Sequence, residues 1–358
     1  MSKTKPASFH VALTHDFYDN QGKPKFDDLG LAVFDPYPHI EVSNFSNHQP
    51  VIAAEQLAGV NGVIVLTPQV TRETLADPEN LLAIGRFGVG YDSVDVPACS
   101  EADVLAIITA GAVDRPVAEA TIMWMLALTH QLRVKDRLVR TGQWDDRSQW
   151  MGCELRDRTF GAVGLGGIAT KTVEMLNGFG MNPPLAFDPY VDPKIAEKAG
   201  VRLVGLDELL QQADFVSLHC PLTDGTRGLI GAGQIDMMKP TAYLINTARG
   251  GIVDEDALYD ALRANRIAGA ALDCFVEEPI TQPHCFGDLD NILLSPHAIA
   301  WTHELFRDVG RTACQAMVDL SVGCRPTGVL NPELFDKNSF RKKWARLIGL
   351  TDPQALKG

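Results

Sequence analysis

A glycine-rich stretch in the middle of the chain constrains the fold more than any other feature. Residues 159–169 combine an apolar strand pattern, Gly164-x-Gly166-x-x-Ala169 and a helical continuation. Gly164 permits a tight turn, Gly166 lets the backbone approach a pyrophosphate, and Ala169 allows close packing of helix on strand. The N-terminus of the following helix would hold the phosphates. The stretch predicts a dinucleotide site contacted by Gly164, Gly166, Gly167 and Ile168.

An acidic residue follows at the distance that such a site requires. Asp188 ends the next predicted strand, where a carboxylate would accept hydrogen bonds from the adenosine ribose diol. The same carboxylate would repel a 2′-phosphate by ~4 kcal/mol at ~4 Å and an effective dielectric of ~20. We therefore expect the cofactor to be NAD rather than NADP.

The position of this loop determines the predicted domain organisation. The 358 residues exceed what one core usually serves, and apolar strand patterns alternate with helical ones, which indicates α/β architecture with parallel sheets. The loop comes after a complete α/β unit in the sequence. We therefore predict a dinucleotide-binding domain (113–301) inserted into a smaller domain (1–112 and 302–335). For the tail 336–358, a loosely docked helix and a frayed end are equally compatible. The expected strands are 9–14, 60–66, 81–87, 104–108, 160–163, 184–187, 215–218, 242–245, 269–272 and 292–294, and the expected helices include 71–75, 94–102, 115–140 and 302–322.

Charge and cysteine content exclude several classes of protein. The formal net charge of −13 disfavours nucleic acid and anionic membrane surfaces as partners. The seven cysteines form no CxxC pair and no metal-ligand spacing, so we expect no metal. The first residues carry no apolar signal segment, which favours the cytoplasm.

Three predicted strands of the inserted domain end in chemically distinct side chains: Arg249, Glu278 and His297. In an open parallel sheet these carboxyl ends line the ligand crevice. Reduction of a 2-oxo acid needs this set: an imidazolium to protonate the developing alkoxide, a carboxylate to keep it charged and oriented, and a guanidinium to bind the substrate carboxylate. His219 also follows a strand, but no carboxylate stands at a matching position, so we expect a cofactor contact rather than catalysis.

Taken together, these motifs resemble those of the D-isomer-specific 2-hydroxyacid dehydrogenases. The resemblance runs in order from about Leu81 to Pro332 and includes Gly88-Val-Gly-Tyr-Asp92, Pro116-Val-Ala-Glu119, Gly164-Leu-Gly-Gly-Ile-Ala169, His219-Cys-Pro-Leu-Thr223, Asn246-Thr-Ala-Arg249-Gly250, Asp273-Cys-Phe-Val-Glu-Glu278-Pro279 and Ser295-Pro-His297. It implies a Rossmann NAD-binding domain inserted into a flavodoxin-like substrate domain, a crevice between them, and a homodimer.

The resemblance also implies residue roles. Arg249 would bind substrate, Glu278 would tune the imidazole, and His297 would be the acid/base. Val89 and Gly90 would offer backbone amides to the substrate carboxylate, with Asn246 and Asp273 at the nicotinamide end. The remaining implied cofactor contacts are His219, Pro221, Thr223, Thr247, Ala248, Arg249 and His297.

Departures from the family pattern leave the substrate open. Ala298–Trp301 replaces the usual Gly-Gly after His297, and strand 63–68 lacks the arginine that phosphoglycerate-type members often carry, although Arg72 or Arg86 could still meet a phosphate. No regulatory domain is expected after Phe335. Glyoxylate or hydroxypyruvate reduction, sugar-acid oxidation and phosphoglycerate oxidation all stay open. The rival class is an NAD(H)-sensing, corepressor-like binding protein. For Trp144 and Trp150, contact with a partner subunit and shielded packing both stay open.

Overall fold

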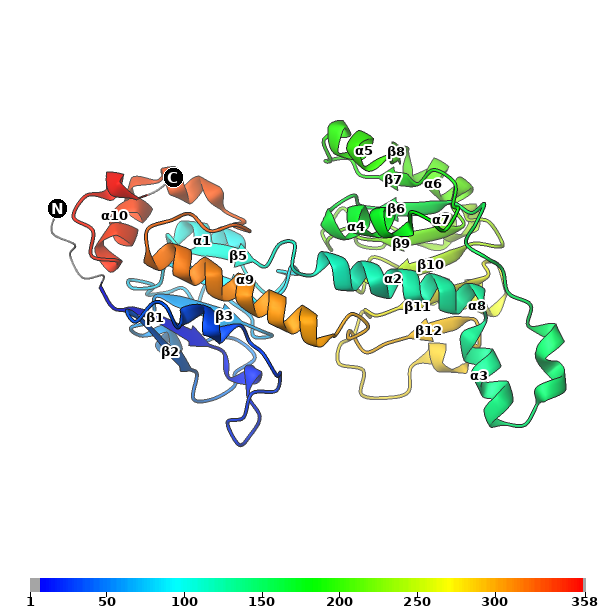
Figure 1. Cartoon of the computed structure of the whole chain (residues 1–358), viewed down its shortest axis with the longest axis horizontal. Coiled ribbons are helices and arrows are strands. Elements are labelled where there is room, and N and C mark those ends of the chain that lie inside the picture. Colours follow the sequence, from blue (N-terminus) through cyan, green and yellow to red (C-terminus); the bar gives the residue numbers. More distant parts are fainter. Residues whose placement is uncertain (1–6, 357–358) are drawn as a thin grey trace. The chain divides into compact units, whose positions relative to one another are not determined.

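Residues 7–356 are described by a computed structural model, in which the chain divides into two compact units. Unit 1 contains residues up to 113 together with those from 302 onward, and unit 2 contains residues 114–301 (Figure 1). The predicted tail 336–358 therefore falls within unit 1. In this described part of the chain, no helix is long and apolar enough to cross a membrane.

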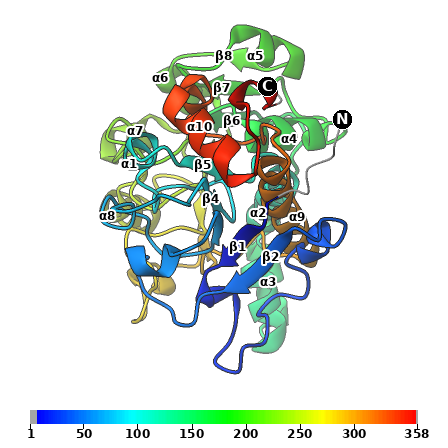
Figure 2. The same cartoon turned by 90° about the vertical axis from the view of Figure 1, so that its left-hand side faces the viewer.

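Unit 1 is built on a five-stranded, wholly parallel sheet (Figure 2). Its strands are β1 (Phe9–Leu13), β2 (Ile40–Asn44), β3 (Gly62–Val65), β4 (Ala83–Arg86) and β5 (Leu105–Ile108). The strand order β2-β1-β3-β4-β5 is that of flavodoxin-like folds. The connections include α1 (Val96–Glu101) and the 3₁₀ helices η1 (His15–Phe17), η2 (Leu31–Phe34) and η3 (Ala54–Leu57).

Both faces of the unit 1 sheet are covered. Helix α9 (His303–Ser321) lies against one face, so closely that a side chain at Gly62 or Gly85 would meet Met317 at 2.5 or 2.7 Å. On the other face, Ala98 and Cys99 of α1 join the core formed by β3, β4 and β5. A sheet buried on both sides explains the continuous apolar strands in the sequence.

The C-terminal segment is a docked helix rather than a frayed end. Helix α10 (Asn338–Leu347), placed between η6 (Pro332–Asp336) and η7 (Pro353–Ala355), buries Phe340 and Trp344 completely or nearly so. The indole Nε1 of Trp344 donates a hydrogen bond to the Leu320 carbonyl at 2.8 Å, which ties α10 to the end of α9.

Unit 2 holds a seven-stranded parallel sheet in the order β12-β11-β10-β9-β6-β7-β8. The strands are β6 (Phe160–Val163), β7 (Leu185–Phe187), β8 (Arg202–Leu203), β9 (Phe215–Leu218), β10 (Tyr243–Asn246), β11 (Gly269–Leu272) and β12 (Ile292–Leu294). The helices are α2 (Asp114–Thr129), α3 (Leu132–Arg140), α4 (Gly167–Leu176), α5 (Pro193–Ala199), α6 (Leu206–Gln212), α7 (Ala232–Met237) and α8 (Glu255–Arg263), with η4 (Trp144–Gln149) and η5 (Cys285–Asp288).

Neighbouring residues along these strands pack into two separate hydrophobic cores. Val163 and Val216 point into a core closed by α6, α7 and α8, whereas Ala162 and Phe215 point into one closed by α2 and α4. The first strand of the unit, β6, lies between β9 and β7. Strand order therefore reverses between β6 and β9, and this switch point is where open α/β sheets bind ligands.

The α/β class with parallel sheets and a Rossmann domain is confirmed, but several local predictions are wrong. Residues 71–75 form a turn, in which Thr74 Oγ1 donates to the Ile52 carbonyl at 2.7 Å. The predicted helix 115–140 is two helices, because Gln131 adopts a left-handed conformation and the Thr129 carbonyl accepts a hydrogen bond from Cys153 N. Strands β2 and β8 were not anticipated, since one is largely exposed and the other has two residues.

Candidate active site

The glycine loop lies at the switch point of unit 2. Gly164 has φ +93°, and a Cβ there would lie 2.9 Å from backbone atoms of His219 and Cys220, so the end of β9 requires glycine at this position. A Cβ at Gly166 would meet nothing within 4 Å, which leaves its backbone open to a ligand. At Gly167 a Cβ would collide with the carboxylate of Asp114 at 2.1 Å. A side chain at Gly167 would therefore displace the Asp114 carboxylate of α2, a contact that the sequence did not reveal.

Asp188 holds the glycine loop in place. Its Oδ2 accepts a hydrogen bond from Leu165 N at 2.8 Å, and its Oδ1 accepts from Tyr190 N and Val191 N at 2.9 and 3.1 Å. The carboxylate predicted to bind the ribose diol thus also fixes the geometry of the loop beside it.

His219, which follows β9, and Thr247, which follows β10, have buried polar atoms without a hydrogen-bond partner among residues 7–356. Both ring nitrogens of His219 and the hydroxyl of Thr247 are shielded from solvent and make no hydrogen bond within that part of the chain. Burial lowers the pKa of His219 to about 4, so the imidazole is neutral near pH 7. Unpartnered buried groups of this kind are uncommon and call for an explanation. They fit a site whose remaining hydrogen bonds come from a bound dinucleotide.

The segment after His219 forms a short exposed turn. Thr226 Oγ1 donates to the Pro221 carbonyl at 2.6 Å and accepts from Thr223 N at 2.8 Å. Pro221 and Thr223 therefore lie on a stabilised loop at the carboxyl edge of β9.

The turn after β10 presents Arg249. Asn246 is 1% exposed, and its amide group donates to the Arg249 carbonyl at 2.8 Å and accepts from Ala248 N at 3.0 Å. A Cβ at Gly250 would lie 1.9 Å from the Phe275 carbonyl oxygen, so glycine is required where this turn meets the next. The side chain of Asn246 thus braces the turn that carries Arg249, and its place at the nicotinamide end stays a prediction.

The loop after β12 presents His297 in a left-handed conformation, with φ +53°. Such a backbone is uncommon for a non-glycine residue and needs support from its surroundings. That support comes from Asp273, whose Oδ1 accepts from Ala298 N at 2.9 Å and from Ile299 N at 3.1 Å. Burial raises the pKa of Asp273, although these hydrogen bonds and one from Ser295 act in the opposite direction. The two amides belong to Ala298 and Ile299, the residues that directly follow His297.

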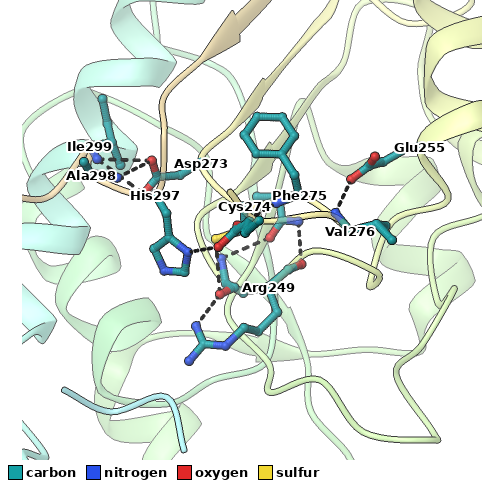
Figure 3. A network of polar contacts seen from close by, with 12 residues as sticks. Arg249, Glu255, Asp273, Cys274, Phe275, Val276, His297, Ala298 and Ile299 are labelled. Atoms are coloured by element: carbon teal, nitrogen blue, oxygen red, sulfur yellow. Dashed lines mark hydrogen bonds and ion pairs between the residues drawn. The ribbon is translucent and has the colours of Figure 1, made fainter. Parts of the chain in front are cut away.

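Glu278 connects two of the strand ends. Its Oε1 accepts a hydrogen bond from Phe275 N at 2.9 Å, while its Oε2 lies 2.7 Å from Nδ1 of His297. Burial tends to raise the pKa of Glu278, but the hydrogen bonds from His297 and Phe275 and the nearby charge of Arg249 hold it below its ordinary value. Figure 3 shows the His297 ring and the Arg249 guanidinium projecting toward the same side of this network. The structure thus brings Arg249, Glu278 and His297 together within unit 2.

The predicted substrate loop belongs to unit 1. Val89 and Gly90 follow β4, where the Gly88 carbonyl accepts a hydrogen bond from Thr109 N at 3.0 Å. Of the two candidate phosphate contacts, Arg72 is paired with Glu101 on the surface, and Arg86 contacts the Phe87 carbonyl.

Comparison with known proteins gives the family. Residues 122–298 match the model of the D-isomer specific 2-hydroxyacid dehydrogenase NAD binding domain. A glyoxylate reductase of Thermofilum pendens is 35% identical over 287 residues, which cover 78% of this chain and 83% of that one. The chain belongs to the family of D-isomer-specific 2-hydroxyacid dehydrogenases. NAD is the cofactor that this family binds, in agreement with the glycine loop described above.

Other relatives differ in length. A D-3-phosphoglycerate dehydrogenase of Archaeoglobus fulgidus is 37% identical over 76% of this chain but only 51% of its own length. The chain thus spans about half the length of that relative. The fold is shared with a glyoxylate reductase from Paecilomyes thermophila, with a TM-score of 0.77 and 24% identity over 91% of this chain and 99% of that one.

The buried His219 predicts a specific loss of stability in acid. The unfolded chain takes up a proton near the ordinary value of 6.5, whereas the folded protein takes it up only near 4. The free energy of unfolding should therefore fall as the pH drops from 6.5 to 4. The contribution of His219 to this fall is about 3 kcal/mol in total. In His219→Gln this contribution disappears. The free energies of unfolding that urea denaturation gives for the NAD-free protein at pH 7 and at pH 5 should therefore differ less than in the parent. The exposed His48→Gln is the control. Equal pH dependence in His219→Gln and the parent would contradict the assignment.

Proposed function

We propose that the chain is an NAD-dependent oxidoreductase that transfers a hydride between the nicotinamide and C2 of a small 2-hydroxy or 2-oxo acid. The observation that supports this most directly is the 2.7 Å contact between Glu278 and His297, with the charge of Arg249 close enough to lower the pKa of that carboxylate. The names of the relatives, glyoxylate reductase and D-3-phosphoglycerate dehydrogenase, agree with this class of reaction.

NAD, when bound, supplies or accepts the hydride, and the chain's own side chains handle charge and protons. With Nδ1 directed at Glu278, the other ring nitrogen of His297 is available to protonate the C2 oxygen during reduction and to remove the proton during oxidation. Glu278 fixes the orientation of the ring through the 2.7 Å contact with Nδ1. Arg249 pairs with the substrate carboxylate. Val89 and Gly90 stay predicted contacts of the same carboxylate.

Residues 298–301 make the wall beside His297 bulkier than the family's Gly-Gly. Trp301 is 57% exposed at the end of this segment. We propose that the substrate is a small 2-hydroxy or 2-oxo acid. Assays with a set of 2-oxo acids distinguish glyoxylate from hydroxypyruvate, phosphohydroxypyruvate and sugar-derived acids. A dinucleotide sensor of the corepressor kind is the second candidate; the complete set of Arg249, Glu278 and His297 favours the enzyme.

The reaction is tested by following NADH absorbance with glyoxylate, hydroxypyruvate, pyruvate, phosphohydroxypyruvate and branched or sugar-derived 2-oxo acids. We expect turnover with at least one of them. His297→Asn should lower kcat by about 10²- to 10⁴-fold, because general acid–base catalysis contributes that much, while NADH fluorescence titration stays within a few-fold. NADH binding without turnover across the panel would favour the sensor, and near-normal turnover in His297→Asn would contradict the acid/base role.

We also propose that the chain forms a homodimer through unit 2. An apolar groove of about 640 Å³ runs along the outer side of α2 and α4, lined by Glu119, Ile122, Met123, Leu126, Ala127, His130, Leu132, Met175 and Phe179. The following arm, α3 and η4, exposes Leu132, Val139 and Trp144 by 60–64%. Trp144 is therefore not shielded within the chain. Large adjoining apolar patches of this kind usually mark protein contacts, and a second copy of the chain is the occupant that the family resemblance implies.

Light scattering should give twice the chain mass of 39.0 kDa for the parent protein. Met123 is 47% exposed at the groove, so Met123→Asp should shift the protein toward the monomer. Ile195→Asp, at a residue with 48% exposure on α5, is the matched control and should stay dimeric. A monomeric parent, or a dimer that Met123→Asp leaves unchanged, would contradict this interface.

A reducing compartment is consistent with this function. Cys285 is an exposed free thiol. We propose a cytoplasmic enzyme whose partners are a small 2-hydroxy or 2-oxo acid and a second copy of itself.

A further inference from the structure

A buried thiol adjoins the Glu278–His297 pair. Cys274 lies two residues beyond the end of β11, is 1% exposed, and has its Sγ 3.4 Å from the Ala248 carbonyl oxygen. One ligand atom each from Cys274, Glu278 and His297 lies within 4.8 Å of the other two. Figure 3 shows Cys274 and His297 within the same polar network. Among the described residues 7–356, this is the group of three such side chains that lies close enough to hold a metal ion.

We propose that this cluster is an inhibitory site for Zn²⁺ or a similar thiophilic divalent cation, bound by Cys274, Glu278 and His297. Thiolate and imidazole ligands favour zinc over magnesium or calcium, which prefer all-oxygen sites. Three protein ligands with one open position are the arrangement of non-structural zinc sites. The cation would therefore bind without any further side chain.

The distances require only local adjustment. Zinc–ligand bonds of about 2.0–2.3 Å place the atoms of a tetrahedral site roughly 3.3–3.7 Å apart. The widest separation in the cluster, at most 4.8 Å, would shrink by about 1 Å, and the 2.7 Å contact between Glu278 and His297 would widen. The His297 and Glu278 side chains are 47% and 35% exposed, so the ion can reach them from solvent.

Binding has a defined proton balance. The thiol proton of Cys274 leaves to solvent as the sulfur becomes a thiolate ligand, and His297 binds through an unprotonated ring nitrogen. A metal on either nitrogen prevents formation of the imidazolium. Inhibition of turnover by zinc therefore rests on the proposed function, whereas the binding of the ion does not.

Cobalt(II) serves as the spectroscopic probe because it reports thiolate ligation by a charge-transfer absorption band. Titration of the NAD-free, tag-free protein with CoCl₂ should give this band with one ion per chain, and ZnCl₂ should displace it. In Cys274→Ser the band should disappear. Zinc affinity should fall at least about 100-fold, since even groups that only orient ligands contribute about 10- to 100-fold. Absence of the band in the parent protein would overturn the proposal.

The control is Cys285→Ser. Cys285 is exposed and its Sγ lies 3.6 Å from His284 Nδ1, so it is the neighbouring thiol that could bind cobalt instead. This variant should keep the band, and its loss there would overturn the assignment to Cys274. Circular dichroism and NADH titration of Cys274→Ser establish that it is folded.

Activity gives an independent readout. With a turned-over 2-oxo acid, micromolar ZnCl₂ should inhibit the parent and Cys285→Ser reversibly, with recovery on adding EDTA. Cys274→Ser should turn over normally and resist zinc. Equal zinc inhibition in parent and Cys274→Ser would overturn the inhibitory role. A cobalt band in a protein without turnover would support the metal site and contradict only the proposed dehydrogenase activity.

Discussion

The carboxylate of Glu278 is the group on which the chemistry of this site depends. One of its oxygens accepts the Phe275 amide at 2.9 Å and the other lies 2.7 Å from the imidazole of His297, so a single side chain joins the ends of β11 and β12. Hydrogen bonds and the charge of Arg249 hold the pKa of Glu278 below its ordinary value, so it stays ionised and can accept a hydrogen bond from Nδ1 of His297. The orientation of the His297 ring therefore depends on this one carboxylate.

The surrounding backbone is arranged to keep this pair in position. Asp273 stabilises the left-handed His297 by accepting hydrogen bonds from the two following amides. Asn246 stabilises the turn of Arg249 by donating a hydrogen bond to the Arg249 carbonyl. Gly250 allows that turn to approach the Phe275 carbonyl closely. His297 and Arg249 thus each lie on a loop that one buried polar residue fixes. Pre-organisation of this kind lets loops at strand ends hold reacting groups accurately.

Much of this could be predicted from the sequence because the signals are local. Apolar runs located most of the strands, and the spacing from Gly164 to Asp188 located the dinucleotide loop. Arg249, Glu278 and His297 could be found because each lies in the segment that follows a strand pattern. The bracing roles of Asn246 and Asp273 could not be found, since they depend on which backbone amides face those side chains after folding. The same holds for the close approach of the Asp114 carboxylate to Gly167, because Asp114 lies 53 positions earlier in the chain. Likewise, the break between α2 and α3 depends on a hydrogen bond from Cys153, which no local pattern indicates.

The most direct test of the central claim is the turnover of Glu278→Gln beside that of its neighbour Glu277→Gln. The amide keeps the shape of Glu278 but removes its charge, so His297 is no longer held by a carboxylate that accepts a hydrogen bond from Nδ1. We predict that kcat for 2-oxo acid reduction falls by about 10²- to 10⁴-fold in Glu278→Gln, the size of the contribution of general acid–base catalysis. Glu277 is exposed, and Glu277→Gln should turn over normally. Near-normal turnover in Glu278→Gln would contradict the claim that this carboxylate positions His297 for proton transfer.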